Sequence, residues 1–258
     1  MFEFTKPQRL IQIEPRMPEF YLKDFLPIPK NAITMISAAG GSGKTFLAIQ
    51  IAIRFVQEEI HEFNDSKVLL WLSEDPIGLT RHRADVILSR IPKVGTHFQN
   101  VDVIDDMPQH LNLDNFSKYK ELFREYDLVV LDPLIAFYGG EENSNSEARF
   151  FMNLLNKIAR DNRQSFIIIH HAGKGQEQKS RGAGAFVDAV RLSYEIKIME
   201  DTIKREIVVA KDNYGVKQII GNSKIINILP YQISFENIVD DKQTTQQPKT
   251  KKSIWEVI

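Results

Sequence analysis

Continuous apolar segments alternate with stretches of helical periodicity through the first two thirds of the chain. The apolar segments are short and unbroken, as expected of parallel strands that are covered on both faces. Regular alternation of such strands with helices predicts an α/β fold with a mainly parallel central sheet flanked by helices. We expect strands at residues 32–36, 67–73, 101–104, 126–133 and 166–171, and helices at 46–55, 77–91, 113–124 and 146–162.

Two local signals refine this pattern. Asp75 precedes Pro76, which is a favourable first residue of a helix, so we expect Asp75 to cap the helix at 77–91. Residues 173–184 are rich in glycine and mostly basic, and they predict a loop.

The last third of the chain has a different pattern. Segments at 191–199, 203–211 and 224–238 are joined by turns and predict an antiparallel extension of the sheet.

Composition divides the chain into a core and two flanking segments. Residues 1–30 contain several prolines, and we expect an extended lead-in that packs on the core or on a neighbouring subunit. Residues 31–239 form the predicted domain. Residues 240–258 are mainly polar, and we expect disorder there, except for a short apolar end at 253–258 that can dock as a peptide.

Length and composition narrow the classes of protein. A chain of 258 residues suits one large domain with small appendages. No apolar run approaches the ~18 residues that span a bilayer, and the first residues lack a signal-peptide pattern. The chain has no cysteine, which excludes disulfides, thiolate metal sites and cysteine nucleophiles and fits a cytoplasmic protein.

The net charge of −1 restricts how the chain can contact nucleic acid. Proteins that coat nucleic acid are usually clearly basic. Any contact must therefore come from a local basic patch, or from loops that oligomerisation brings together.

A phosphate-binding loop is predicted between the strand at 32–36 and the following helix. Its glycines let backbone N–H groups surround an anion, and the helix N-terminus adds partial positive charge. Lys44 can reach the outer phosphates, and the Thr45 hydroxyl can hold Mg²⁺. The alternative is an ordinary glycine-rich turn before a helix. The expected nucleotide contacts are Ala39, Gly40, Gly41, Ser42, Gly43, Lys44, Thr45 and Phe46.

Two carboxylates follow buried strands. Asp132 ends the fourth predicted strand and can organise Mg²⁺ beside Thr45, although a cap or turn role is the alternative. Glu74 follows the second strand and can deprotonate an attacking water, unless it merely opens a helix. The carboxyl ends of parallel strands share one edge of a sheet, so we expect these two side chains to meet there.

Two histidines end the fifth predicted strand. A polar side chain there can contact the γ-phosphate and report the nucleotide state to the following loop. His170 is the preferred sensor, with His171 and a purely structural core histidine as alternatives. The two side chains point to opposite faces of a strand, which argues against a shared metal.

Several cations lie far from the phosphate-binding loop in the sequence. Lys174, Lys179 and Arg181 can contact phosphates of single-stranded nucleic acid, or form a solvated surface loop that lacks an aromatic stacking platform. Arg191 and Lys211 can stabilise a transferring phosphoryl group across a subunit boundary, or be surface charge.

The ordered set of motifs resembles the RecA-like ATPases of the plasmid replicative helicase group, the RepA type. The resemblance covers roughly residues 20–220, and the histidine-containing strand end followed by the small-residue segment is its most specific part. The motifs are Gly40-Gly41-Ser42-Gly43-Lys44-Thr45, Leu72-Ser73-Glu74-Asp75, Val129-Val130-Leu131-Asp132-Pro133-Leu134, Ile169-His170-His171-Ala172-Gly173-Lys174, Arg181-Gly182-Ala183-Gly184-Ala185 and Lys211-Asp212-Asn213-Tyr214-Gly215.

This resemblance implies a RecA fold, a ring that is usually hexameric, and ATP with Mg²⁺ bound between subunits. It also implies movement along single-stranded DNA driven by hydrolysis. The implied roles are phosphate and Mg²⁺ binding for Lys44 and Thr45, metal binding for Asp132, base for Glu74, sensor for His170, and trans finger for Arg191 with Lys211.

Two positions depart from the pattern. Ala38 replaces the first glycine of the loop, and Asn213 stands where related ring helicases often have arginine. The second departure shifts the finger role toward Arg191.

Two functions remain open at this point. The first is an ATP-hydrolysing ring motor on single-stranded DNA, a replicative-type helicase of a plasmid or phage-like element. The second is an ATPase switch or loader for replication or recombination partners that does not unwind DNA. A nucleotide-binding structural subunit without turnover is disfavoured by Glu74, Asp132 and Arg191 together. The near-neutral charge mildly favours the switch.

Overall fold

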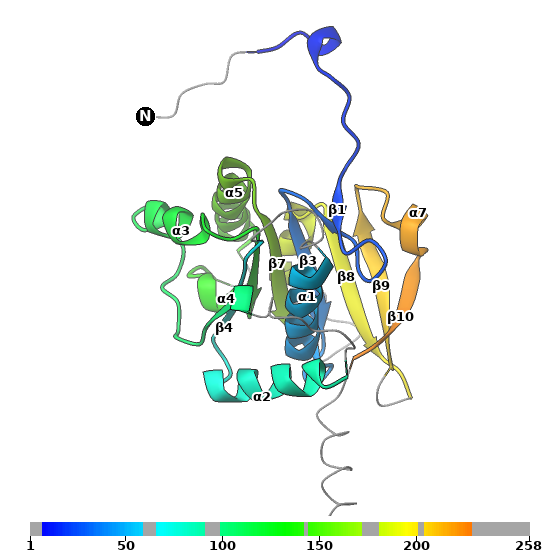
Figure 1. Ribbon diagram of the computed structural model, residues 1–258. Helices are drawn as coiled ribbons and strands as arrows, with labels where there is room; N and C mark the ends of the chain where they lie inside the picture. The colour runs from blue at the N-terminus through cyan, green and yellow to red at the C-terminus, as the bar shows by residue number, and fades with distance from the viewer. Residues whose placement is uncertain are drawn as a thin grey trace, which may run out of the picture.

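An eight-stranded sheet organises the fold (Figure 1). The computed structural model describes residues 7–58, 66–90, 99–141, 144–171, 181–200 and 204–228. In these ranges the strands are β1 (Phe20–Tyr21), β2 (Ile28–Pro29), β3 (Ile33–Ala38), β4 (Val68–Leu72), β5 (Val101–Ile104), β6 (Leu128–Asp132), β7 (Ser165–His171), β8 (Leu192–Ile198), β9 (Lys204–Asp212) and β10 (Ser223–Asn227). The helices are η1 (Leu10–Gln12), α1 (Lys44–Glu58), α2 (Ile77–Leu88), α3 (Phe116–Phe123), α4 (Leu134–Phe137), α5 (Asn145–Asn162), α6 (Arg181–Ala189) and α7 (Lys217–Ile220).

The strand order in the large sheet is β10-β9-β8-β3-β7-β6-β4-β5. Strand β3 pairs in parallel with both β7 and β8, and parallel pairing continues through β6, β4 and β5. Strands β9 and β10 add antiparallel pairs at one edge. The predicted α/β fold, with its mainly parallel sheet and its antiparallel C-terminal extension, is therefore confirmed.

Both faces of the sheet are covered, which explains the unbroken apolar runs. Alternate strand residues point to opposite faces, so β3, β4, β6 and β7 each supply two separate cores. One core joins the sheet to α1 and α2, and the other joins it to α3, α4, α5 and α6. In β6, for example, Val130 belongs to the first core and Leu131 to the second.

The glycine-rich segment is partly helical, contrary to the predicted loop. Residues 181–189 form α6, and within it Ala185 and Phe186 are buried in the second core. The glycines suggested a loop, but burial of one apolar helix face outweighs their low helix propensity of about 1 kcal/mol each. Residues 172–180 lie outside the described part of the chain.

The predicted cap of α2 is wrong. The Ile77 N–H donates to Oδ2 of Asp105, which follows β5, at 2.8 Å. The Asp75 carboxylate instead forms an ion pair with Arg83, nearly two turns into the helix. Tertiary contacts therefore supply the acceptor that we expected from the adjacent residue.

Other elements differ in extent. Helix α3 begins three residues later than predicted, and the short helices α4 and α7 were not predicted. The predicted tail at 240–258 lies outside the described residues, as does the end of the third C-terminal segment.

The lead-in has two parts. Residues 20–29 form a short hairpin, and its Leu22, Leu26 and Ile28 are buried in the first core. Residues 7–19 extend away from the domain (Figure 1), and Leu10 and Ile11 there are 85% and 92% exposed. No helix in the described ranges combines the length and apolar character needed to cross a membrane.

The Tyr194 hydroxyl ties the lead-in hairpin to the sheet. Tyr194 is fully buried and donates to the Pro27 carbonyl oxygen at 2.6 Å. We expect Tyr194→Phe to lower the free energy of unfolding by about 1–3 kcal/mol, because it leaves a buried carbonyl without its donor. Chemical denaturation measures this. Tyr126→Phe is the control, since that hydroxyl donates to the exposed Asp102; an equal loss in both variants would contradict the prediction.

Candidate nucleotide-binding site

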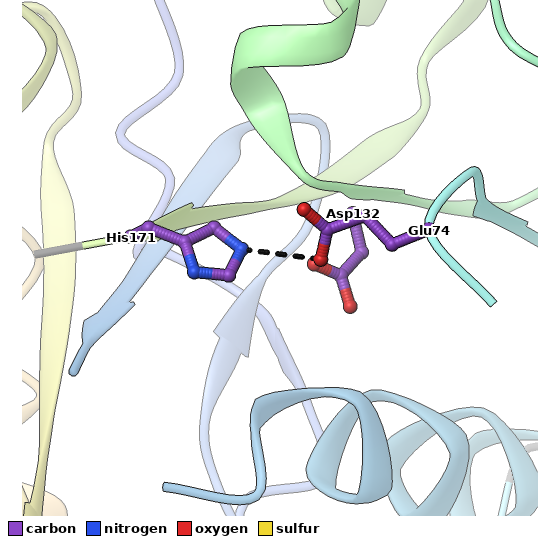
Figure 2. A group of neighbouring side chains, drawn as sticks. All are labelled: Glu74, Asp132 and His171. Carbon is purple, nitrogen blue, oxygen red and sulfur yellow. Dashed lines mark ion pairs between the residues drawn. The ribbon is translucent and has the colours of Figure 1, made fainter. Parts of the chain in front are cut away.

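Three strand ends bring acidic and basic side chains together at the carboxyl edge of the sheet. Glu74 follows β4, Asp132 ends β6 and His171 ends β7. Figure 2 shows the three side chains converging. Glu74 Oε2 and His171 Nε2 are 3.5 Å apart, and one ligand atom from each of the three residues lies within 4.8 Å of the others. Their proximity follows from the parallel pairing of β4 with β6 and of β6 with β7.

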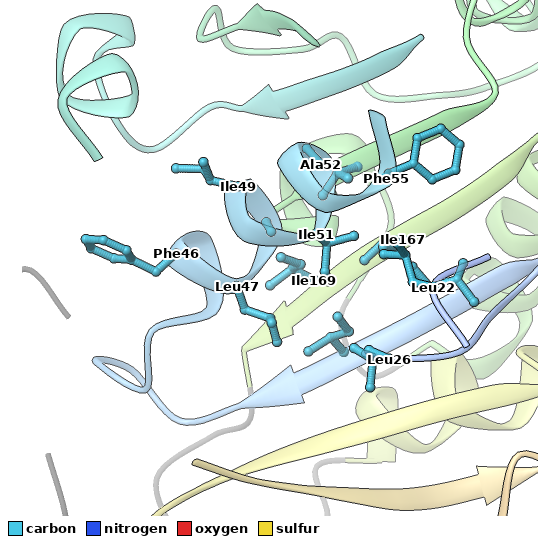
Figure 3. Packing of buried hydrophobic residues seen from close by; sticks show 14 of the residues in the cluster. Leu22, Leu26, Phe46, Leu47, Ile49, Ile51, Ala52, Phe55, Ile167 and Ile169 are labelled. Carbon is cyan, nitrogen blue, oxygen red and sulfur yellow. The ribbon is translucent and has the colours of Figure 1, made fainter. Parts of the chain in front are cut away.

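The phosphate-binding loop lies at the same edge, between β3 and α1. Helix α1 is fixed over the sheet by buried side chains that include Leu47 and Ile51 (Figure 3). Before the helix, Gly41 and Gly43 have φ angles of 74° and 92°, in the left-handed region that favours glycine. The strand, loop and helix expected from the sequence are thus present at the predicted positions.

Lys44 and Thr45 begin α1 and face the carboxylates. The Lys44 Nζ donates to the carbonyl oxygens of Ala38 and Ala39, at 3.2 and 2.9 Å. The Thr45 hydroxyl donates to Asp132 Oδ2 at 2.9 Å. A buried carboxylate beside a hydroxyl is an oxygen-donor set of the kind that Mg²⁺ prefers, so Asp132 and Thr45 fit the predicted metal.

The structure explains why alanine is tolerated at position 38. Ala38 is the last residue of β3, is 1% exposed, and is paired in register with His171 of β7 and with Ile196 of β8. This position is extended, so it does not need the positive φ that only glycine adopts freely. The left-handed positions of the loop are Gly41 and Gly43.

The two histidines face opposite sides of the sheet. His171 shares a face with Ile167 and Ile169, the face on which α1 packs, and it reaches Glu74. His170 faces the other side, where its ring lies 5.8 Å from the ring of Phe186 in α6. The preferred sensor, His170, is therefore placed to contact α6, whereas His171 is placed to contact the carboxylates.

Arg191 and Lys211 lie at the opposite, amino edge of the sheet. Arg191 precedes β8, and Lys211 is paired with Ser193 near the start of that strand. The Lys211 Nζ donates to the carbonyl oxygens of Val187 and Asp188 near the end of α6, at 3.0 and 2.8 Å. Neither cation contacts the phosphate-binding loop of its own chain.

Arg191 lines a polar cavity of about 520 Å³ at this amino edge. Arg160 of α5 and Tyr214 line the same cavity. Burial raises the pKa of Tyr214, while the charges of Arg191 and Arg160 oppose the rise, which shows that both guanidinium groups lie near this hydroxyl. Arg160 was not singled out in the sequence, because a cation in the last turn of a helix is ordinary.

The proposed nucleic-acid contacts are only partly placed. Lys174 and Lys179 lie outside the described residues. Arg181 begins α6, the next described element after β7 in the chain.

Comparison with known proteins agrees with this geometry. Residues 2–177, more than half of the chain, match the AAA domain family. The chain belongs to this family. The AAA domain is also similar in fold to a solved structure described as the ATPase domain of G40P, with a TM-score of 0.56 and 16% sequence identity, over 76% of this chain and 81% of that one. Family and fold support a RecA-like P-loop ATPase domain; the RepA type remains a prediction.

Burial sets the protonation chemistry of the AAA domain's site. Burial raises the pKa of Asp132 from 3.8 to about 6, and the charge of Glu74 adds to the rise. The hydrogen bond from Thr45, and the charges of His171 and Lys44, act in the opposite direction. Burial also lowers the pKa of Lys44, which the charges of Asp132 and Glu74 oppose. A bound cation would stabilise the ionised form of Asp132.

The raised pKa of Asp132 predicts a pH-dependent stability. Between about pH 4 and pH 6 the folded state holds a proton that the unfolded state has lost, so this group lowers the stability as the pH rises through that window. Asp132→Asn removes the effect. At pH 7.5 we expect the free energy of unfolding of the variant to exceed that of wild type by up to about 3 kcal/mol. Near pH 4 this difference should disappear.

Denaturant unfolding of the nucleotide-free protein at both pH values measures this difference. Asp114→Asn, which changes an exposed carboxylate, serves as the control. A gain of the same size at pH 4 and pH 7.5 would refute the assignment.

Proposed function

We propose that this AAA domain is an ATP-hydrolysing ring motor that acts on single-stranded DNA, of the replicative helicase type found in plasmids or phage-like elements. The observation that carries the proposal is the division of the catalytic groups between two edges of one sheet. The phosphate-binding loop and the carboxylates occupy the carboxyl edge, and Arg191 occupies the amino edge. Subunits placed edge to edge in a ring would complete each site with the neighbour's arginine.

Within one subunit the chemistry divides among four residues. Lys44 neutralises phosphate charge, and Thr45 with Asp132 holds Mg²⁺, which supplies further charge neutralisation. Glu74, whose side chain is 57% exposed, orients and deprotonates the attacking water. Without nucleotide, the carboxylate of the proposed base, Glu74, pairs with the His171 side chain.

Arg191 is the stronger candidate for the trans finger. Its side chain is exposed and lines the amino-edge cavity. Lys211 already donates to two helix carbonyls, which supports a role in holding α6 and the edge in place. The trans role of Lys211 is therefore secondary to that of Arg191.

The extended lead-in supports a homo-oligomer. Residues 7–19 contact little of the domain, and the apolar Leu10, Ile11 and Met17 are each at least 85% exposed. An arm of this kind buries its apolar surface when it packs on a neighbouring subunit. We propose a hexameric ring in the cytoplasm, in which Lys174, Lys179 and Arg181 face single-stranded DNA.

A nucleotide-controlled switch or loader for replication or recombination partners is the second candidate. It uses the same site, and the net charge of −1 favours it, since a processive motor gains from a more positive channel.

ATP hydrolysis with and without single-stranded DNA, read beside the mass in solution, separates the two functions. The motor predicts a hexamer whose turnover rises at least about tenfold with DNA, which corresponds to about 1.4 kcal/mol. Glu74→Gln should keep ATP binding and lose this turnover, because the amide cannot accept the proton from water.

Replacing Lys174, Lys179 and Arg181 with alanine should weaken DNA binding and flatten its salt dependence.

In the hydrolysis assay, a small oligomer whose turnover DNA does not stimulate would favour the switch. Turnover unchanged in Glu74→Gln would remove Glu74 as the base.

Mixed rings test whether Arg191 acts in trans. Arg191→Ala and Lys44→Ala should each abolish hydrolysis when alone. In a mixture, an interface that pairs an intact loop with an intact arginine regains one complete site, so turnover should return in part. Arg124→Ala, at an exposed position beyond α3, should hydrolyse normally. Absence of rescue at every mixing ratio would count against a shared site.

A further inference from the structure

The outer hairpin of β9 and β10 contacts the phosphate-binding loop. Strand β9 runs antiparallel to β8, so its first residues lie beside the last residues of β8, at the carboxyl edge of the parallel strands (Figure 1). Arg205 is paired with Ile198 at this end. The hairpin therefore brings a cation to the carboxyl edge from a part of the chain far from the loop in sequence.

Arg205 is buried at 8% exposure and holds a backbone carbonyl of the loop. Its Nε donates to the Ser42 carbonyl oxygen at 2.9 Å, and its Nη1 donates to the Lys204 carbonyl oxygen at 2.7 Å. Burial of a guanidinium group is costly unless its donors are satisfied. The contact with Ser42 is thus part of what makes this burial possible.

The contact constrains the direction of the next N–H group. The Ser42–Gly43 peptide is trans, so its C=O and N–H point in opposite directions. With the carbonyl turned toward Arg205, the Gly43 N–H faces away from the hairpin. In the described part of the chain, no acceptor takes a hydrogen bond from this N–H.

The same hairpin packs against Gly43 from a second position. A Cβ at Gly43 would lie 3.1 Å from Cγ2 of Ile228, which follows β10. The φ of Gly43 is 92°, a conformation that favours glycine. The tertiary hydrogen bond therefore limits how this peptide can rotate, and Ile228 leaves little room for a side chain at Gly43.

We propose that Arg205 is a positioning residue that orients the Gly43 N–H toward the phosphates of a bound nucleoside diphosphate or triphosphate. The inference rests on the proposed nucleotide site and adds a residue that no motif marks. Arg205 acts through the peptide: it holds the carbonyl outward, so that the N–H is preorganised for the anion before binding.

Two other roles of Arg205 make different demands on its chemistry. As a source of positive potential it would need its charge, and as a simple structural tie it would affect stability more than affinity. Positioning requires an N–H donor at Nε. Glutamine places its Nε2 the same number of bonds from the backbone without a charge, whereas lysine keeps the charge and places a methylene there.

Titration of a fluorescent ADP analogue in the presence of Mg²⁺ compares these roles. We expect Arg205→Met and Arg205→Lys to weaken binding about ten- to hundredfold, the range of a lost hydrogen bond to a charged group. Arg205→Gln should stay within about threefold of wild type.

Thermal melting of each variant accompanies the titration. Arg54→Met is the matched control, because Arg54 lies in α1 and stacks on Phe25, with its guanidinium carbon 4.3 Å from the ring centroid. We expect it to lower the melting temperature while leaving ADP affinity within about twofold of wild type.

The order of affinities decides the inference. If Arg205→Gln binds the ADP analogue more tightly than Arg205→Lys does, positioning is supported. Equal affinities of the two variants, or the reverse order, overturn it. This comparison holds even if Arg205→Met does not fold. Failure of the wild-type protein to bind the ADP analogue would instead refute the proposed nucleotide function itself.

Discussion

Burial of a carboxylate beside the phosphate-binding loop is the constraint on which the rest of the site depends. Asp132 is 4% exposed, and its ionised form is disfavoured unless nearby groups compensate. Thr45 donates a hydrogen bond to it, and the charges of Lys44 and His171 favour the ionised form. Asp132 is buried because β6 lies inside the sheet, between β4 and β7, and a cation bound there would stabilise its ionised form.

The parallel sheet places the carboxylates and Arg191 at opposite edges. Parallel strands place their carboxyl ends at one edge and their amino ends at the other. Glu74 and Asp132 therefore meet beside the loop, while Arg191 lies at the far edge with Arg160 and Tyr214 around a polar cavity. A single subunit thus keeps the carboxylates and Arg191 at opposite edges of the sheet, which is the physical basis for proposing a site shared between subunits.

Much of this arrangement was predictable from residue order alone. Unbroken apolar runs indicated parallel strands with two covered faces, and the positions just after them indicated Glu74 and Asp132. The choice between His170 and His171 was different. Alternation shows that they face opposite sides, but both sides are apolar along β7, so the sequence does not say which side carries α1. Helix α6 was missed because burial of Ala185 and Phe186 overrides the glycine signal.

The sequence by itself determined the phosphate-binding loop, the alternation of the parallel strands with the longer helices in the first two thirds of the chain, and the residues that follow those strands, because these depend on local spacing and periodicity. Tertiary structure decided which distant groups meet. The antiparallel course of β9 brings Arg205 to the Ser42 carbonyl, and Asp105 rather than Asp75 supplies the acceptor for α2. Such contacts depend on the order of the strands in the sheet, which no local pattern encodes.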